Sequence, residues 1–275
     1  MFPEIHKLFN THYRMLVDSH CHLNFPDFKE DLDEVLVRAQ NADVKVLQTI
    51  CTKITEFPDV LSLTENHDSI YCSIGIHPHH VSDEPRFEPD AIVGIANRYP
   101  SIIGIGETGL DYYYENSPRE AQRESFCAHI DVARKTGLPV IIHSRSADED
   151  TASMLRAEHE KEPFPGVIHC FTAGRSVAEA ALECGLSISL SGIVTFKNAH
   201  SLRNIIQDLP VDKLLIETDA PFLSPVPRRG VRNEPSFVSH TAEFIADLLA
   251  IETEQFADQS SDNFFALFTR ARRPS

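Results

Sequence analysis

The amino-acid sequence predicts an α/β protein with the fold of a (β/α)8 TIM barrel. Two observations carry this prediction. Short β-branched runs recur eight times along the 275 residues, and most of the intervals between them carry helix-like patterns. Polar residues also gather at the carboxyl ends of these runs, where parallel barrels build their chemistry. Strands that alternate with helices in this way are typical of one parallel sheet.

The expected strands are, in order, 16–20, 44–50, 70–76, 102–107, 139–144, 166–170, 186–192 and 213–218. Helix-like patterns are clearest at 31–40, 118–137 and 176–185. The strands are nearly continuous apolar runs, which fits a sheet that is covered on both faces. A closed barrel is favoured over a doubly wound sheet because no G-x-G-x-x-G motif follows an early strand.

We expect a single domain over residues 15–275, because no composition break divides the chain and about 250 residues are typical of one α/β barrel. Residues 1–14 precede the first strand and are expected to be a dispensable extension, with Met15 as an alternative start of translation. Residues 219–238 contain four prolines, and a segment this long is expected to serve function or act as a lid.

Composition excludes several classes of protein. The chain has 25 basic and 41 acidic side chains, and a formal charge of −16 argues against general coating of nucleic acid. With 42% hydrophobic content and no low-complexity tract, disorder and coiled coil are excluded. No apolar run reaches the roughly 18 residues needed to span a bilayer, and no signal core opens the chain. We therefore expect a cytoplasmic protein, with no membrane partner and no obligate protein partner.

Six residues of types that bind metals lie at the ends of expected strands. They are His20, His22, Glu107, His143, His169 and Asp219. His20 and His22 are two apart, so the period of a strand points both to one side. Because the carboxyl ends of barrel strands converge on one mouth, all six are expected to meet there. Four imidazoles with two carboxylates suit zinc, manganese or iron, whereas magnesium prefers a site richer in oxygen.

Ordered motifs along the chain resemble the TatD family of metal-dependent deoxyribonucleases, within the amidohydrolase-like superfamily. The motifs are DSHCHLNF, GIHPHH, GETGLDYYY, PVIIHSR, GVIHCFT, SGIVTFKNA and ETDAPFLSPVPRRGVRNEPSFV. The resemblance covers about residues 15–270 and implies a TIM-barrel hydrolase with two divalent ions, of magnesium, manganese or zinc. It assigns one ion to His20, His22 and Asp219, the second ion to His143 and His169, and the bridging position to Glu107.

The expected activity is hydrolysis of a phosphodiester bond in DNA by a metal-activated water, with two ions roughly 3.5 to 4 Å apart. By the resemblance, Asp219 and Glu107 are the catalytic residues, and Asp219 also accepts the proton of the water. Family precedent favours an exonuclease that removes nucleotides from a 3′ end. DNA is thus the expected substrate and partner.

The expected substrate contacts are His77, Arg145, Lys197, Arg228 and Arg229. His77 ends the third strand, Arg145 closely follows His143, and Lys197 follows the seventh strand, so each can face a phosphate. The two arginines belong to the densest basic cluster of the chain, which also contains Arg232.

Other residues near the mouth are interpreted as structural. His79 and His80 are expected to be solvated loop residues, and the tyrosines 112–114 to pack a loop onto the barrel rather than to stack on bases. The turn at 233–235 is expected to anchor the final loop and to begin a helix.

Two other classes of function stay open on the sequence. The same ligand set supports attack on a carbonyl, so an amidohydrolase acting on a small amide, lactone or ester is the alternative enzyme. A non-catalytic binding protein is the third class. No G-x-S-x-G motif is present, which argues against triad chemistry.

Overall fold

A computed structural model describes residues 15–274 of the chain, so the expectation for residues 1–14 lies outside the described residues. Eight parallel strands pair in sequential order in one sheet. They are β1 (Leu16–Cys21), β2 (Val44–Thr49), β3 (Ile70–Ile74), β4 (Ile102–Asp111), β5 (Val140–Arg145), β6 (Gly166–Ile168), β7 (Ser187–Leu190) and β8 (Leu214–Ile216). Each predicted strand is present, but β4 runs on to Asp111 rather than ending at Glu107.

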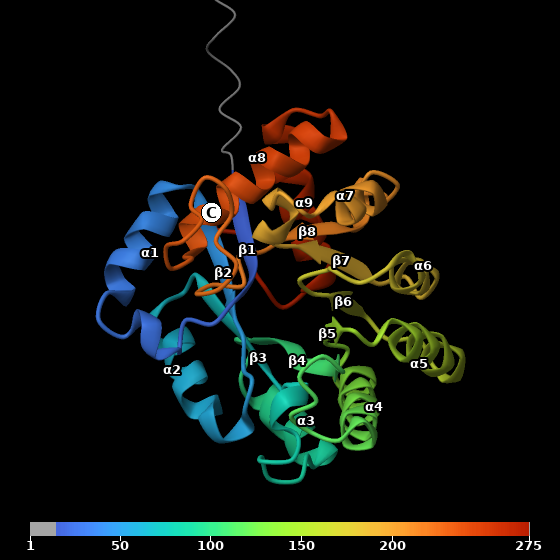
Figure 1. The fold of residues 1–275 in the computed structure, drawn as a ribbon. Coiled ribbons are helices and arrows are strands. Elements are labelled where there is room, and N and C mark those ends of the chain that lie inside the picture. The colour runs from blue at the N-terminus through green and yellow to red at the C-terminus, as the bar shows by residue number, and fades with distance from the viewer. Residues whose placement is uncertain (1–14, 275) are drawn as a thin grey trace, which may run out of the picture.

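Helices follow the strands and surround the sheet (Figure 1). They are α1 (Leu32–Asn41), α2 (Phe57–Asn66), α3 (Pro89–Arg98), α4 (Arg119–Thr136), α5 (Asp148–Lys161), α6 (Arg175–Glu183), α7 (His200–Ile206), α8 (Val238–Leu249) and α9 (Thr253–Leu267). The predicted TIM barrel is therefore confirmed. Gly137 ends α4 with a φ of 70°, a left-handed conformation that glycine adopts without strain.

The sheet closes where β1 meets β8 at their carboxyl ends. The amide of Asp219 donates to the carbonyl of His20 at 2.9 Å, and the amide of His22 donates to the carbonyl of Ala220 at 2.8 Å. Below these bonds, the buried carboxylate of Asp18 accepts the amide N–H of Thr218 at 2.9 Å. Residues some 200 positions apart are thus joined at the mouth, a closure that periodicity does not encode.

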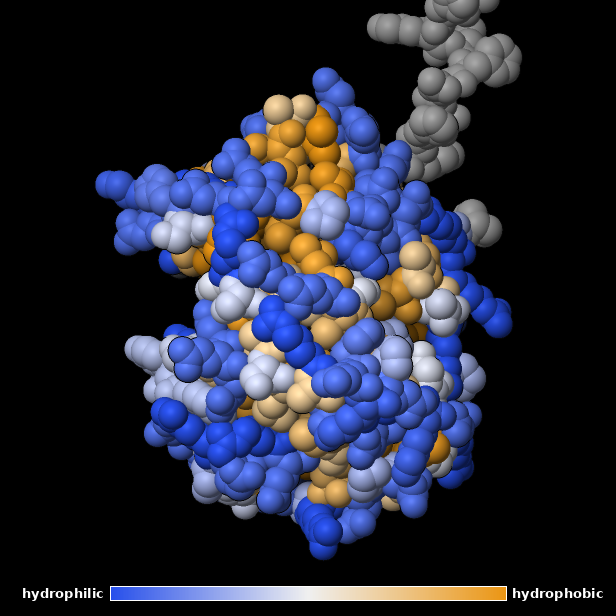
Figure 2. Space-filling view, turned by 90° about the vertical axis from the view of Figure 1, so that its right-hand side faces the viewer, coloured by the Kyte–Doolittle hydropathy of each residue, from blue (hydrophilic) through white to orange (hydrophobic). Residues whose placement is uncertain are grey.

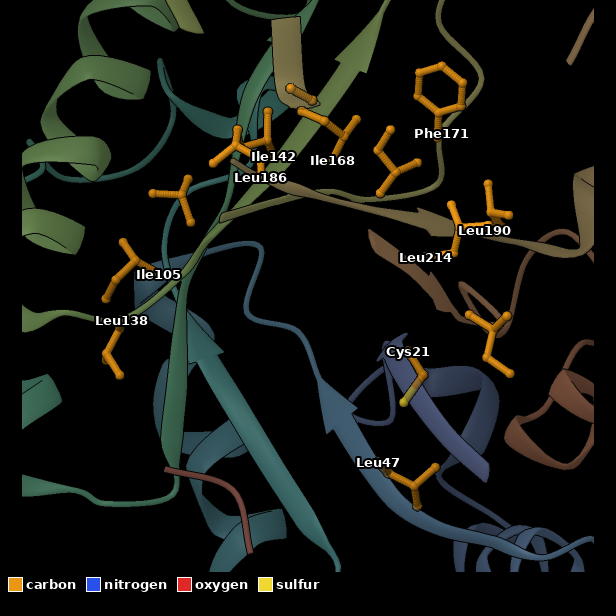
Figure 3. Close-up of a cluster of buried hydrophobic side chains, with 14 of the residues drawn as sticks. Cys21, Leu47, Ile105, Leu138, Ile142, Ile168, Phe171, Leu186, Leu190 and Leu214 are labelled. Atoms are coloured by element: carbon orange, nitrogen blue, oxygen red, sulfur yellow. The ribbon is translucent and has the colours of Figure 1, made fainter. Parts of the chain in front are cut away.

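Alternate residues of the strands belong to two separate cores. One set packs against the helices, and Figure 3 shows members of it on several strands, among them Leu47, Ile142, Ile168 and Leu214. The residues between them, such as Ile141 and Leu215, form a second cluster with Phe264 and Phe268 at the end of α9. Because strand side chains alternate between faces, the second cluster fills the barrel interior. The mouth above it is left for polar side chains.

The outer surface is mainly polar. Figure 2 views the side of the molecule that carries α5 to α7 and shows hydrophilic residues over most of it, with hydrophobic residues gathered in a strip in the upper half. Among the described residues, no helix has the length and apolar character that a membrane crossing requires. The six cysteines are all free, and four of them are buried.

Candidate metal centre

Glu107 is the central side chain at the mouth of the barrel. Its Oε2 atom lies 3.4 Å from Nε2 of His20. Its Oε1 atom lies 2.7 Å from Nε2 of His169 and 3.1 Å from Nδ1 of His143. The two carboxylate oxygens therefore face different histidines.

A β-bulge aims Glu107 into the barrel. The register between β4 and β5 shifts between Ile105 and Thr108, and Gly106 has a φ of 131°, which side chains with a Cβ rarely adopt. A Cβ at Gly75 would lie 2.4 Å from the Cα of Gly106, so only glycine allows the end of β3 to approach this bulge. Two glycines thus bring the loop after β3, which carries His77, next to Glu107.

Asp219 lies on the other side of the centre, directly after β8. Its Oδ1 atom is 3.3 Å from Nε2 of His22 and 3.8 Å from Nε2 of His20. The rings of His20 and His22 lie 5.1 Å apart, and His20 stacks on His169 at 3.9 Å. The structure therefore brings together all six residues that the sequence singles out as ligands.

Two carboxylates that the sequence analysis missed support the histidines from behind. Oδ2 of Asp111 is 3.1 Å from Nε2 of His143, and Oε1 of Glu217 is 3.3 Å from Nδ1 of His169. Such outer carboxylates fix the ring orientation and tautomer of histidines that bind metals. A signal was available for Asp111, which is four residues after Glu107 in the same strand, a spacing that shares one strand face. Glu217 lies past the end of β8, where the period of a strand gives no such signal.

His77 faces the centre as a donor. Its Nδ1 atom accepts the backbone N–H of His79 at 3.1 Å, so the ring proton of the neutral imidazole must lie on Nε2. Nε2 lies 3.4 Å from Oε1 of Glu107. Burial lowers the pKa of His77 to about 4, which keeps the ring neutral near pH 7. His77 consequently presents an N–H, not a lone pair, to the centre.

The donor set fits divalent cations. Both ring nitrogens of His20 and Nδ1 of His22 are buried without a hydrogen-bond partner among the described residues, a costly arrangement unless a ligand completes it. Candidate ligand atoms lie within 4.8 Å of one another in three overlapping groups: His20, His169 and Glu217; His20, His22 and Glu107; and His77, Glu107 and His143. The tautomer of His77 removes it from the third group as a ligand.

The charge state of the two carboxylates suits metal binding. Burial opposes ionisation of Glu107, but the charge of His169 and the hydrogen bonds from His143 and His169 outweigh it and hold the pKa of Glu107 well below its usual range. Burial likewise opposes ionisation of Asp219, and its hydrogen bond with His22 and the charges of nearby histidines lower its pKa. Both groups are anionic at neutral pH.

A cavity of about 670 Å³ opens over the centre. Its lining includes His77 and Arg145, but not Lys197, Arg228 or Arg229. The Arg229 guanidinium instead lies 3.8 Å from the ring of Phe196, and the Arg228 guanidinium lies 5.1 Å from the ring of Phe237. These two expected substrate contacts pack on the barrel surface in the structure.

The final loop is anchored, as expected. Arg232 binds Asp31 of the loop before α1 through two contacts of 2.7 Å, and Arg38 of α1 holds Glu234 at 2.7 Å. Asn233 is fully buried and donates to the carbonyl of Thr218 at 2.9 Å. This anchoring holds the preceding part of the loop over the cavity.

Two expectations for the rim are wrong. His79 and His80 are partly buried and line the cavity rather than being solvated, because Asp111 holds Nε2 of His79 at 2.9 Å. Of the three tyrosines, only Tyr112 packs on the core, where its hydroxyl donates to Asp150. Tyr113 and Tyr114 are 62% and 53% exposed.

A TIM barrel with a buried histidine and carboxylate centre at its mouth defines the class of metal-dependent hydrolases. The model of the TatD related DNase family matches residues 17–269, and the chain belongs to this family.

The relatives agree with this class. Over 256 residues the chain is 40% identical to the uncharacterized metal-dependent hydrolase YcfH of Escherichia coli K12, covering 92% of this chain and 95% of that protein. It is 38% identical over 254 residues to the uncharacterized metal-dependent hydrolase YabD of Bacillus subtilis 168, covering 92% and 99%. The crystal structure of YjjV, a TatD homologue from Escherichia coli K12, matches with a TM-score of 0.86 at 28% identity, covering 93% and 98%.

Proposed function

We propose that this hydrolase cleaves phosphodiester bonds of DNA and removes nucleotides from a 3′ end. The observation that carries the proposal is the position of Glu107, whose two oxygens face separate histidines. A carboxylate placed in this way can contact two divalent ions at once, as a two-metal hydrolase site would use it. The family description as DNase supports DNA as the substrate.

In this proposal, His20, His22 and Asp219 would hold one divalent ion, and His143 and His169 a second. Glu107 would contact both. Divalent cations at such a site polarise phosphoryl oxygens and lower the pKa of water. The nitrogen-rich donor set favours zinc or manganese over magnesium.

The remaining steps fall to side chains of the chain itself. Asp219 is anionic and partly open to the cavity, so its free carboxylate oxygen accepts the proton of the attacking water. His77 donates its Nε2 proton in a hydrogen bond to a phosphoryl oxygen, which stabilises charge that develops there. Arg145 binds phosphate at the rim.

A small amide, lactone or ester is the alternative substrate. Arg145 is the only lysine or arginine among the described residues that line the cavity, so the mouth holds few phosphates. A carbonyl substrate needs no further cation at the rim. The scarcity of cations in the lining is thus the observation that favours a small substrate.

The two functions are separated by assaying purified protein on oligonucleotides labelled at either end, and on a panel of small amides and lactones, with each divalent ion. We expect nucleotide release from the 3′ end. His143→Ala and Asp219→Asn should each abolish it, while His200→Ala, an exposed histidine on α7, serves as the matched control. Turnover of small amides without any cleavage of oligonucleotides would overturn the proposal.

A further inference from the structure

The cavity over the metal centre has two chemically different walls. Phe25, Ile193, Phe222 and Leu223 form one side of its lining, which we name the apolar wall. Tyr114 and Arg145 also line it, and together with Tyr113 they form the cationic wall. Neither wall supplies a ligand to the centre. Both therefore remain available to the parts of a substrate that flank the bond to be broken.

The apolar wall adjoins His22. The rings of Phe25 and His22 stack at 4.7 Å with an angle of 21° between their planes. Phe222 lies 6.0 Å from Phe25, edge to face, and is 50% exposed. The loop after β8 thus holds a bare aromatic ring at the mouth, next to the half of the centre that contains Asp219. Exposed aromatic rings of this kind are surfaces on which bases stack.

The cationic wall adjoins His143, at the other half of the centre. The Arg145 guanidinium lies 4.3 Å from the ring centre of Tyr113 and 4.7 Å from that of Tyr114. The two rings meet edge to face at 4.8 Å. Arg145 forms no ion pair with any described residue, whereas Arg38, Arg123 and Arg232 each pair with a carboxylate. Two tyrosines therefore hold one unneutralised cation at the rim.

We propose that the cavity places the terminal base of a DNA chain on the apolar wall and the next phosphate on the cationic wall. The proposal rests on the proposed function and adds the placement of the substrate. The charge of each wall decides which of them takes the end of the chain. A chain end has no further phosphate beyond its terminal nucleoside, so it fits the wall without lysine or arginine. The continuing strand is a polyanion and fits the wall that carries Arg145.

This placement sets a geometric requirement on the end of the chain. The metal centre lies between the walls, so the bond to be cleaved lies there as well. Bases on either side of that bond must then separate toward opposite walls. Adjacent bases of an intact duplex are stacked and paired, so they meet this requirement only after the end has opened, which costs a few kcal/mol.

The first test compares two oligonucleotides that differ only in whether the terminal sugar carries a base. With the metal-loaded protein, Phe222→Ala should raise KM on the order of tenfold for the end with a base, and change it little for the abasic end. Val231→Ala removes another exposed apolar side chain of the same loop, outside the cavity lining, and should change neither. An equal rise for both ends in Phe222→Ala would overturn the base assignment.

The second test needs no turnover. Asp219→Asn protein is mixed with a strand that carries a fluorescent adenine analogue, whose emission falls on stacking, at either the end or an internal position. We expect quenching at the end alone, lost in the additional variant Phe222→Ala, and weaker binding of both strands with Arg145→Gln. Quenching at the internal position alone would overturn the proposal, because it would place the internal base, not the terminal base, on the apolar wall.

The two proposals fail differently. If oligonucleotides are cleaved but neither test responds to Phe222→Ala, the placement is wrong and the nuclease stands. If no oligonucleotide is cleaved or bound, the proposed function fails, and the placement fails with it.

Discussion

Asp111 holds His143 from behind. Oδ2 of Asp111 lies 3.1 Å from Nε2 of His143, while Nδ1 of the same ring lies 3.1 Å from Oε1 of Glu107. The amides of Tyr113 and Tyr114 each donate to Oδ1 of Asp111 at 3.0 Å, so the carboxylate is fixed. When a divalent ion takes the lone pair of Nδ1, the ring proton would lie on Nε2, where Asp111 accepts it.

Loss of this support should weaken metal binding. Asp111→Asn removes the charge that orients His143, and we expect metal affinity to fall by about 10- to 100-fold, with activity recovering at high metal concentration. Calorimetric titration of the metal measures the affinity. The matched control is Asp150→Asn, which removes a carboxylate that pairs with Arg123 outside the centre. Unchanged affinity in Asp111→Asn would contradict the role of Asp111.

Metal removal should lower stability. The centre buries Glu107 and Glu217 beside histidines, and cations that bind only the folded state stabilise it by about 2.7 kcal/mol at a hundredfold excess over Kd. We expect a chelator to lower the Tm of the parent protein by several degrees. The chelator should lower the Tm of His143→Ala much less, and should lower the Tm of His200→Ala as much as that of the parent. A full shift in His143→Ala would show that the metal binds elsewhere.

Acid should destabilise the protein through His129. This buried residue of α4 accepts the amide of Ile76 at 3.0 Å on Nε2 and donates from Nδ1 to the carbonyl of Ser125 at 2.7 Å. Burial lowers its pKa to about 4. In the unfolded chain the imidazole of His129 becomes protonated near pH 6.5. The folding stability that neutral His129 contributes is therefore complete above pH 6.5 and is lost as the pH falls toward 4.

The measurement is urea unfolding of the parent and His129→Gln between about pH 7 and 5. We expect the variant to be less stable than the parent at neutral pH, and to lose less folding stability than the parent when the pH is lowered. The difference between the two proteins should narrow by at most about 1.4 kcal/mol per pH unit. A difference that stays constant with pH would show that His129 titrates normally in the folded state.

DNA binding should depend only weakly on salt. With a charge of −16, and with only Arg145 and the bound divalent ions to offset phosphate charge at the described lining, we expect two or three phosphates to be neutralised, at a slope of roughly 0.7 per phosphate for single strands. Arg145→Ala in metal-loaded Asp219→Asn protein should reduce the slope by about 0.7. The salt slope of the double variant Arg228→Ala and Arg229→Ala is measured for comparison.

These two arginines stack on Phe237 and Phe196, so their loss should leave the slope unchanged. If the double variant lowered the slope and Arg145→Ala did not, the result would support the phosphate contacts that the sequence predicts for Arg228 and Arg229. Titration of a labelled single strand at several salt concentrations gives both slopes.

The sequence by itself determined the strands and the ligand types. Alternation of apolar runs with helical patterns reports which faces must be buried, and this constraint is local, so eight strands could be placed within a few residues. The six ligand candidates followed because polar residues after a buried strand have few positions other than the mouth. The period of 2 along β4 also points to Asp111 on the face of Glu107, a signal that the sequence analysis missed.

Only the tertiary structure decided how these residues act. The contacts of Asp18 with Thr218 and of Glu107 with His20 join segments far apart in the chain, and no local pattern specifies such distances. The proton position on His77 depends on the backbone N–H of His79. Whether Arg145 forms an ion pair depends on which side chains lie near it, and these are tyrosines. Local sequence sets propensity and burial, whereas ligand geometry, tautomers and unpaired charge arise from contacts that exist only after the barrel has closed.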